Sequence, residues 1–228
     1  MELVIGNKNY SSWSLRAWLY LRESGIEFEE VLISLYADDS AERIARFTPA
    51  GRVPVLLDGD VVVWDSLAII EHVRQRSSGA VGWPADRVAR ARAWSIAAEM
   101  HSGFLALREE LPQNVRGRSP VALDRLSLPA RRQVERVFEI WSECRRDHGA
   151  RGDWLFGHFS IADVVYAPVA LRFLTYCIPL PADVRPYVEA VAGLSSVRDW
   201  IADAELEPES LDFIDERWPA SGTPLQFG

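Results

Sequence analysis

Cysteine and positive charge are both scarce in this chain. Only Cys144 and Cys177 occur in 228 residues, too few for a disulfide framework and too far apart for a C-x-x-C metal or redox motif. Acidic residues outnumber basic ones by 33 to 25, which gives a formal net charge of −8. This balance argues against a nucleic-acid-binding protein, because such proteins contact phosphates with basic side chains.

Long uninterrupted apolar segments are also missing. The most apolar stretch, residues 164–182, contains Arg172 and three prolines, so it predicts a buried helix and a loop rather than a membrane span. Residues 1–6 have neither a basic region nor a long apolar region, so we expect no signal peptide. With 48% hydrophobic and 25% charged residues, the composition predicts a soluble globular protein, and we expect it in the reducing cytoplasm.

The first 78 residues alternate between strand-like and helix-like segments. The expected order is a strand at 3–5, a helix between Ser11 or Ser12 and Gly25, a strand at 28–33, a helix at 39–47, strands at 53–57 and 61–64, and a helix at 66–76. Two strands joined by a helix are parallel, whereas the turn at Asp58-Gly59 predicts an antiparallel hairpin. The order β-α-β-α-β-β-α therefore predicts a small mixed α/β sheet.

From residue 79 the composition changes. Residues 79–85 are predicted to be a linker, and 86–228 an all-helical domain without a convincing strand. One long helix is expected from Asp86 to about Leu111, with an apolar stripe formed by Val88, Ala91, Trp94, Ala98, His101 and Leu105. Further helices are expected at about 134–146, 160–176, 183–192 and 196–204, and a capping box from Ser160 to Asp163 starts the second of these.

Two helix starts in the first 78 residues carry groups that can hold an anion. Ser11 and Ser12 precede the first helix, where free N–H groups and the helix dipole favour negative charge. Asp65 and Ser66 stand at the helix that runs to Arg76, where we expect Ser66 to be the cap. They offer a carboxylate for an ammonium group and a hydroxyl for a carboxylate. Plain helix capping is the alternative interpretation at both places.

Three further features are candidates with a structural alternative. A cis peptide at Val53-Pro54 directs the Val53 backbone toward a peptide-like ligand, whereas a trans proline only starts a strand. His101 is the one histidine expected near a cleft. The alternative is a structural histidine whose hydrogen bonds are made within the fold. Trp94 and Phe104 either line a pocket or belong to the core.

In their order and spacing, these features resemble the cytosolic glutathione transferases over nearly the whole chain. The segment from Ser11 to Arg16, Ser-Ser-Trp-Ser-Leu-Arg, is similar to the Ser-Ser-Cys-Ser-x-Arg pattern of the zeta class and, more loosely, to serine-type theta and delta members. The resemblance implies a thioredoxin-like domain over 1–78, an all-α domain over 86–228 that holds an acceptor pocket, a homodimer, and no metal. The role of the segment after Glu205 is left open.

The resemblance also implies roles for individual residues. Ser11 is the expected thiol-activating hydroxyl, with Ser12 as its competitor. The implied glutathione-binding residues are Arg52, Val53, Pro54, Asp65 and Ser66. The acceptor pocket is expected to include Tyr10, Trp13, Trp94, His101 and Phe104.

The implied activity is attack of the glutathione thiolate on a small electrophile, as in detoxification. Trp13 stands where the zeta pattern has cysteine, which puts thiol-dependent isomerase chemistry in question and predicts a narrower acceptor pocket. Three alternatives stay open: a zeta-like isomerase of a maleylacetoacetate-type substrate, a glutathione-dependent dehalogenase or reductase, and a non-catalytic glutathione-binding regulatory module. The sequence does not name the electrophile.

Overall fold

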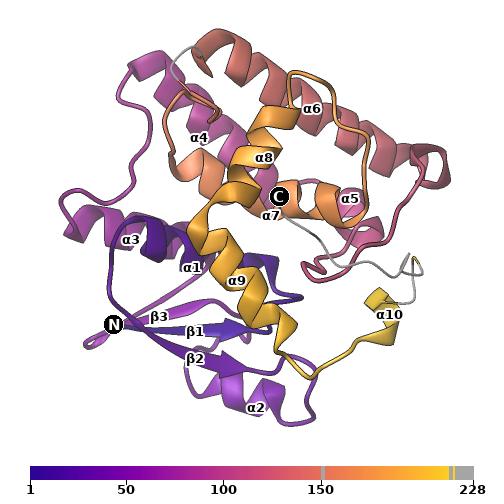
Figure 1. Cartoon of the computed structure of the whole chain (residues 1–228). Coiled ribbons are helices and arrows are strands. Elements are labelled where there is room, and N and C mark those ends of the chain that lie inside the picture. The colour runs from indigo at the N-terminus through magenta and orange to yellow at the C-terminus, as the bar shows by residue number, and fades with distance from the viewer. Residues whose placement is uncertain (150–151, 216–217, 219–228) are drawn as a thin grey trace.

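The computed structural model describes residues 1–149, 152–215 and 218, which form a sheet part and a helical part (Figure 1). The strands are β1 (Glu2–Gly6), β2 (Glu29–Ile33), β3 (Val55–Asp58) and β4 (Val61–Trp64), in the spatial order β2-β1-β3-β4. β1 is parallel to β2 and antiparallel to β3, and β3 is antiparallel to β4. The predicted mixed sheet is confirmed, although β3 begins after Pro54, which has no N–H to donate to a neighbouring strand.

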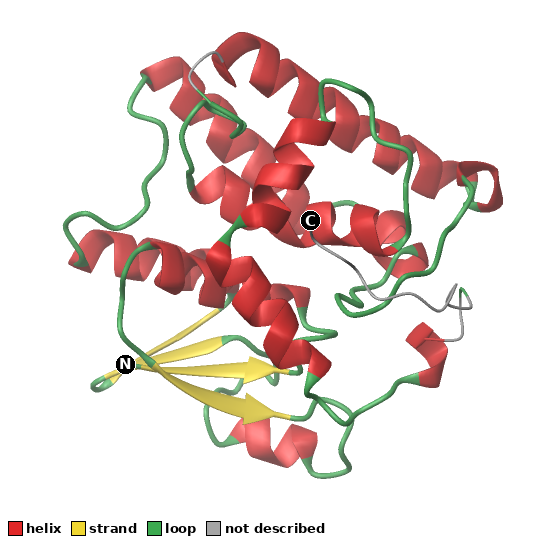
Figure 2. Ribbon diagram, viewed as in Figure 1, coloured by secondary structure: helices red, strands yellow, loops and turns green. Residues whose placement is uncertain are grey.

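Three helices cover the sheet, namely α1 (Ser12–Glu23), α2 (Ser40–Ala45) and α3 (Ser66–Arg76). Alternating side chains of β1 divide the core between the two faces. Leu3 and Ile5 belong to the main core, whereas Val4 packs with Ile33 and Ile44 in a smaller cluster beneath α2. Figure 2 shows α2 on the far side of the sheet from the helical part. Burial on both faces explains why this strand is an uninterrupted apolar run.

The two helix starts singled out by the sequence differ in their caps. Ser11 is the N-cap of α1, and its Oγ accepts a hydrogen bond from the Ser14 N–H at 3.3 Å. At α3 the expected cap is wrong, because Asp65 occupies the N-cap and accepts from the Leu67 N–H at 2.9 Å. Aspartate tolerates the φ of 74° found there, and Ser66 becomes the first helical residue. The hydroxyl of Ser66 is therefore not used for capping.

The helical part contains α4 (Arg87–Ser102), α5 (Leu105–Glu110), the 3-10 turn η1 (Leu123–Arg125), α6 (Leu128–His148), α7 (Ile161–Thr175), α8 (Arg185–Gly193), α9 (Ser195–Glu205) and α10 (Asp212–Asp215). α7 packs against α1, α4 and α8, and burial on all sides explains its apolar composition. The predicted capping box of Ser160 and Asp163 is present at its start. Within the described residues, no helix is long and apolar enough to cross a membrane.

The single helix expected from Asp86 to Leu111 is instead divided in two. α4 ends at Ser102 with Gly103 as its C-cap, and Phe104 adopts a left-handed backbone with a φ of 60° before α5 begins. The buried face of α4 consists of Ala89, Ala93, Ile96, Ala97 and Met100. The expected stripe faces solvent instead, since Val88 and Trp94 are 62% and 52% exposed. The buried face was missed because most of its residues are small alanines, whereas the larger apolar side chains that suggested the stripe lie on the exposed face.

Candidate active site

Two cavities meet at the N-terminal end of α1, between the sheet part and the helical part. The larger, of about 640 Å³, is enclosed by the start of α1, α2, the end of α5 and α10. The smaller, of about 500 Å³, lies beside β4 and the start of α3. Trp13, Arg52 and Val53 line both cavities, so that one extended ligand has access to both.

Ser11 and Ser12 line the larger cavity, and both residues are buried. Ser11 Oγ donates a hydrogen bond to Ser14 Oγ at 2.8 Å, and Ser14 Oγ also accepts from the Gly6 N–H at 3.0 Å. Both hydroxyls can rotate, and when Ser14 donates to Ser11 instead, the hydrogen of Ser11 becomes available to a ligand. Ser12 Oγ accepts from Arg172 Nη2 at 3.1 Å, which leaves its hydrogen available too. Both serines therefore have the geometry of a hydroxyl donor.

Three guanidinium groups lie near the start of α1, one in contact with Ser12 and two against Trp13. Arg16, Arg108 and Arg172 all donate to backbone carbonyl oxygens, and none forms an ion pair with a carboxylate of the described residues. Burial, together with the charge of Arg108, lowers the pKa of Arg172 to about 9. The same causes, with the charge of Arg172 added, place the pKa of Arg16 well below its usual value. Arg108 and Arg172 line the larger cavity, and their positive charge favours an anion there.

Trp13 occupies the space between these charges. Its ring centroid lies 4.5 Å from Cζ of Arg16 and 4.7 Å from Cζ of Arg108, at cation–π distances. The ring also meets the edge of His101, at 5.0 Å between centroids. The indole therefore forms a fixed wall of both cavities at the position where the zeta pattern has cysteine.

The five residues expected to bind glutathione are brought together in the smaller cavity: Arg52, Val53, Pro54, Asp65 and Ser66. The Val53–Pro54 peptide bond is cis. Asp65 Oδ2 lies 3.1 Å from Nε2 of His101. Burial raises the pKa of Asp65, but the hydrogen bond and charge of His101 and the N–H groups of Leu67 and Ala68 together lower it by more, so the net pKa lies below its usual value. Ser66 Oγ is buried without a hydrogen-bond partner among the described residues.

The five expected acceptor residues are only partly brought together. Tyr10 and Trp13 line the larger cavity and His101 the smaller, whereas Trp94 and Phe104 line neither. Trp94 is seven residues, about 10 Å of helix, from His101 and lies against Trp83 instead. The turn between α4 and α5 places Phe104 in the main core.

Several residues of the larger cavity were not predicted: Arg108, Gln113, Arg172, Phe213 and Ile214. Arg172 had a signal in the sequence, because it is the one charge in an apolar segment and a buried charge needs a partner. Gln113 is buried, and neither of its amide atoms has a partner in the described part of the chain. No motif marked Arg108, Gln113 or Phe213. Among the described residues, no group of histidine, cysteine, aspartate and glutamate side chains is arranged to hold a metal ion.

Family models for the glutathione S-transferase N-terminal and C-terminal domains match residues 10–76 and 71–203. The chain belongs to the glutathione S-transferase family. The resemblance and the fold predicted from the sequence are thereby confirmed. In this glutathione S-transferase, residues of both matched regions line the site at the start of α1.

Curated relatives match over different lengths. Glutathione S-transferase 1 of Dianthus caryophyllus is 26% identical over 179 residues, which cover 77% of this chain and 78% of that protein. A dichloromethane dehalogenase of Methylophilus leisingeri is 32% identical over 66 residues, or 28% of this chain. That match spans only 25% of the dehalogenase's length, and a second dehalogenase, from Methylorubrum extorquens, is matched over 23% of its length.

Solved structures of the same fold match nearly the whole chain. A Burkholderia glutathione transferase homolog with bound glutathione has a TM-score of 0.67 and 25% identity, covering 90% of this chain and 97% of that one. A bacterial zeta-class maleyl pyruvate isomerase has a TM-score of 0.68 and 22% identity, covering 92% and 100% of the two chains.

Proposed function

We propose that this chain is a glutathione transferase in which a serine hydroxyl at the start of α1 activates the glutathione thiol. The proposal rests on one observation. The two cavities share Val53 in their lining, and Ser11 lines the larger one. In this proposal residues 1–78 bind glutathione, 79–85 link the domains, and 86–228 complete the acceptor pocket. The glutathione found in the Burkholderia homolog supports this assignment.

The charged ends of glutathione fit opposite ends of the site. In the proposed complex, Asp65 holds the γ-glutamyl ammonium group, and Ser66 with the N-terminus of α3 holds the γ-glutamyl carboxylate. The backbone of Val53 pairs with the cysteinyl unit, and Arg52 meets the glycyl carboxylate. The position of Asp65 in the smaller cavity supports this role, since an aspartate carboxylate is charged at neutral pH.

Activation follows from charge. A free thiol titrates at about 8.5, so glutathione is mostly protonated at neutral pH. A serine hydroxyl, the N-terminus of α1 and the arginine charges all favour the thiolate, and the thiol proton passes to solvent. The sulfur then attacks the electrophilic carbon of the acceptor, forming a C–S bond as the leaving group departs with its bonding electrons.

Calorimetry with glutathione, followed by conjugation assays against an activated aryl halide and other classes of electrophile, tests this proposal. We expect glutathione to bind and at least one class to be conjugated, with one glutathione consumed for each product. Binding without turnover of any class would favour the regulatory module, and absence of glutathione binding would refute the proposal.

A second candidate, a zeta-like isomerase of a maleylacetoacetate-type substrate, is favoured by one observation. Arg108 and Arg172 face the larger cavity without a carboxylate partner among the described residues, and they suit an acceptor that carries carboxylates. In that reaction the thiolate adds to a conjugated cis double bond, the bond rotates, and the thiolate leaves. Glutathione is then regenerated rather than consumed, which separates the two candidates.

We also propose that the chain forms a homodimer. β4 is an edge strand on which Val62 and Trp64 are 42% and 47% exposed. The contact of Asp65 with His101 joins the end of this strand to α4, where the side chains of Val88 and Trp94 are exposed. The exposed apolar side chains on both elements support a subunit interface. With the transferase activity we also propose a detoxifying role in the cytoplasm. Conjugation requires reduced glutathione, and the cytoplasm is a reducing compartment.

A further inference from the structure

The chain beyond α9 returns to the loop that precedes the catalytic serines. The carboxylate of Glu207 accepts a hydrogen bond from the Asn9 N–H at 2.9 Å. Arg116 donates to the backbone oxygens of Glu207, at 2.6 Å, and of Glu209. Residues 207–215, which we name the strap, are therefore bonded both to the first part of the chain and to the loop after α5.

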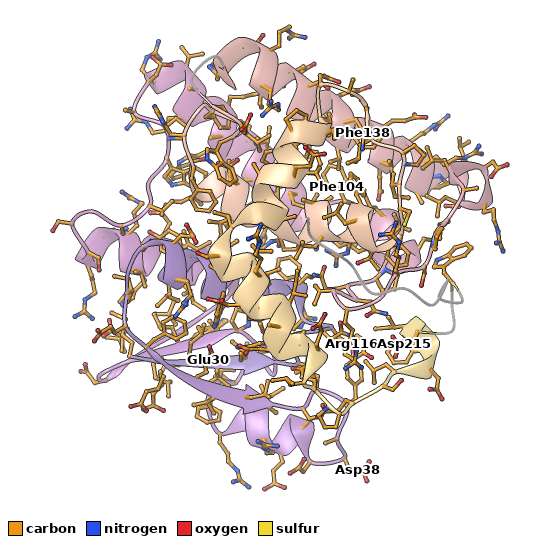
Figure 3. The ribbon with its side chains drawn as sticks, viewed as in Figure 1. Glu30, Asp38, Phe104, Arg116, Phe138 and Asp215 are labelled. Carbon is orange, nitrogen blue, oxygen red and sulfur yellow. The ribbon has the colours of Figure 1, made fainter. Side chains whose placement is uncertain are left out.

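Asp215 is the point at which the strap is anchored. Its carboxylate accepts from the Tyr10 hydroxyl at 2.7 Å, from Asn114 Nδ2 at 2.8 Å, and from the Leu211 N–H at 2.9 Å. Figure 3 shows Asp215 beside Arg116, where α10 approaches the loop after α5. Burial and the hydrogen bond to Asp215 both raise the pKa of Tyr10. The Tyr10 hydroxyl therefore donates its hydrogen to the strap and does not donate to a ligand.

This anchor places an aromatic side chain at the mouth of the larger cavity. Phe213 meets Tyr36 edge to face, at 5.6 Å between ring centroids, and both rings line the cavity. Phe213 is 63% exposed and Tyr36 is 49% exposed, so the two rings are open to an incoming molecule. Ile214, the next residue, packs on Tyr10 and fixes the direction of the turn.

We propose that the strap selects the acceptor, with Phe213 as the specificity-determining residue and Asp215 as the residue that positions it. The inference rests on the proposed function, because it assigns the larger cavity to the group attached to the glutathione sulfur. An apolar substituent long enough to reach the mouth contacts Phe213, whereas a methyl group stays beside the serines. The acceptors favoured by this arrangement are electrophiles with an extended apolar or aromatic group.

Binding of two unreactive thioethers, S-methylglutathione and S-hexylglutathione, tests the proposal by calorimetry. The proteins are the wild type, Phe213→Ala, Asp215→Asn, the double variant, and Asp212→Asn as a control on the same short helix. We expect Phe213→Ala to weaken S-hexylglutathione about tenfold, as expected for about 50 Å² of lost apolar contact, and S-methylglutathione less than about twofold. Asp215→Asn should show the same selective loss, the double variant no additional loss, and the control no change.

Two results would overturn the proposal. The first is a Phe213→Ala variant in which the ratio of the affinity for S-hexylglutathione to that for S-methylglutathione is the same as in the wild type. This variant removes an exposed ring and keeps the test valid even where Asp215→Asn fails to fold. The other is a double variant whose loss is the product of the single losses, because Asp215 would then act independently of Phe213. Failure of the proposed function is distinguishable: without a glutathione site the wild type would bind neither thioether, and without catalysis it would bind them but conjugate no electrophile.

Discussion

Ser11 and Ser12 are adjacent in the chain but are held by different parts of the molecule. Ser11 contacts Ser14, within its own helix, whereas Ser12 contacts Arg172 of α7. A change at Arg172 therefore disturbs Ser12 and leaves the contacts of Ser11 in place. Tyr10 precedes them, yet its hydroxyl points to Asp215 and not to the cavity centre.

Removing the hydroxyl of Ser66 should weaken glutathione binding. Ser66→Ala deletes a buried hydroxyl that has no partner among the described residues, and loss of a hydrogen bond to a carboxylate costs about 1.5–3 kcal/mol. We expect calorimetry to show affinity about 10- to 150-fold lower. Thermal stability should change little because Asp65 caps α3. Ser95→Ala, which removes a hydroxyl bonded within α4, is the control. Unchanged affinity in Ser66→Ala would exclude the γ-glutamyl carboxylate from this position.

At the scale of elements, local chemistry was more predictable than packing. The capping box of Ser160 and Asp163 was predicted correctly because its bonds join residues three apart. The break at Gly103 and Phe104 was missed because α5 is held by packing on α6, which the sequence pattern does not encode. The buried face of α4 was missed for a similar reason, since alanine is buried only where a neighbouring helix approaches closely.

Asp163 should make stability depend on pH. Burial raises its pKa from 3.8 to about 7, although the Leu155 and Ser160 N–H groups donate to its carboxylate. Between those values the folded chain holds a proton that the unfolded chain releases, so the free energy of unfolding falls as the pH rises from about 4 to about 7.

Urea unfolding at a series of pH values measures this decline, which should be shallower in Asp163→Asn than in the wild type. Asp38→Asn, which changes an exposed aspartate, is the control and should follow the wild type. Parallel declines in Asp163→Asn and the wild type would mean that another group is responsible.

At the scale of the whole molecule, the site is assembled from distant segments. Ser12 meets Arg172 and Tyr10 meets Asp215, contacts that span 160 and 205 residues. The sequence indicated the residues of the first 78 positions because their motifs are local and ordered. It missed Arg108 and the strap because a long-range contact leaves no local pattern.

The proposed dimer can be tested through α4. Trp94→Glu places a charge within the exposed apolar face, and we expect the dimer dissociation constant to rise about 100-fold or more, as for a central interface residue. Analytical ultracentrifugation should show a wild-type dimer and a largely monomeric variant. Leu206→Glu, at an 82% exposed position after α9, is the control and should stay dimeric. A monomeric wild type would contradict the assignment of this face.

The central claim, thiol activation by a serine hydroxyl, is tested most directly by titrating enzyme-bound glutathione and following thiolate absorbance in the ultraviolet. The wild type should show a thiol pKa about 2 below the free value, a shift that needs about 2.7 kcal/mol. Ser11→Ala should return the pKa most of the way to about 8.5, while Ser12→Ala and Tyr10→Phe should leave it near the wild-type value. A shift in Ser12→Ala alone would move the role to the neighbouring hydroxyl. A shift in Tyr10→Phe alone, or a wild-type thiol that titrates as in free glutathione, would contradict the account.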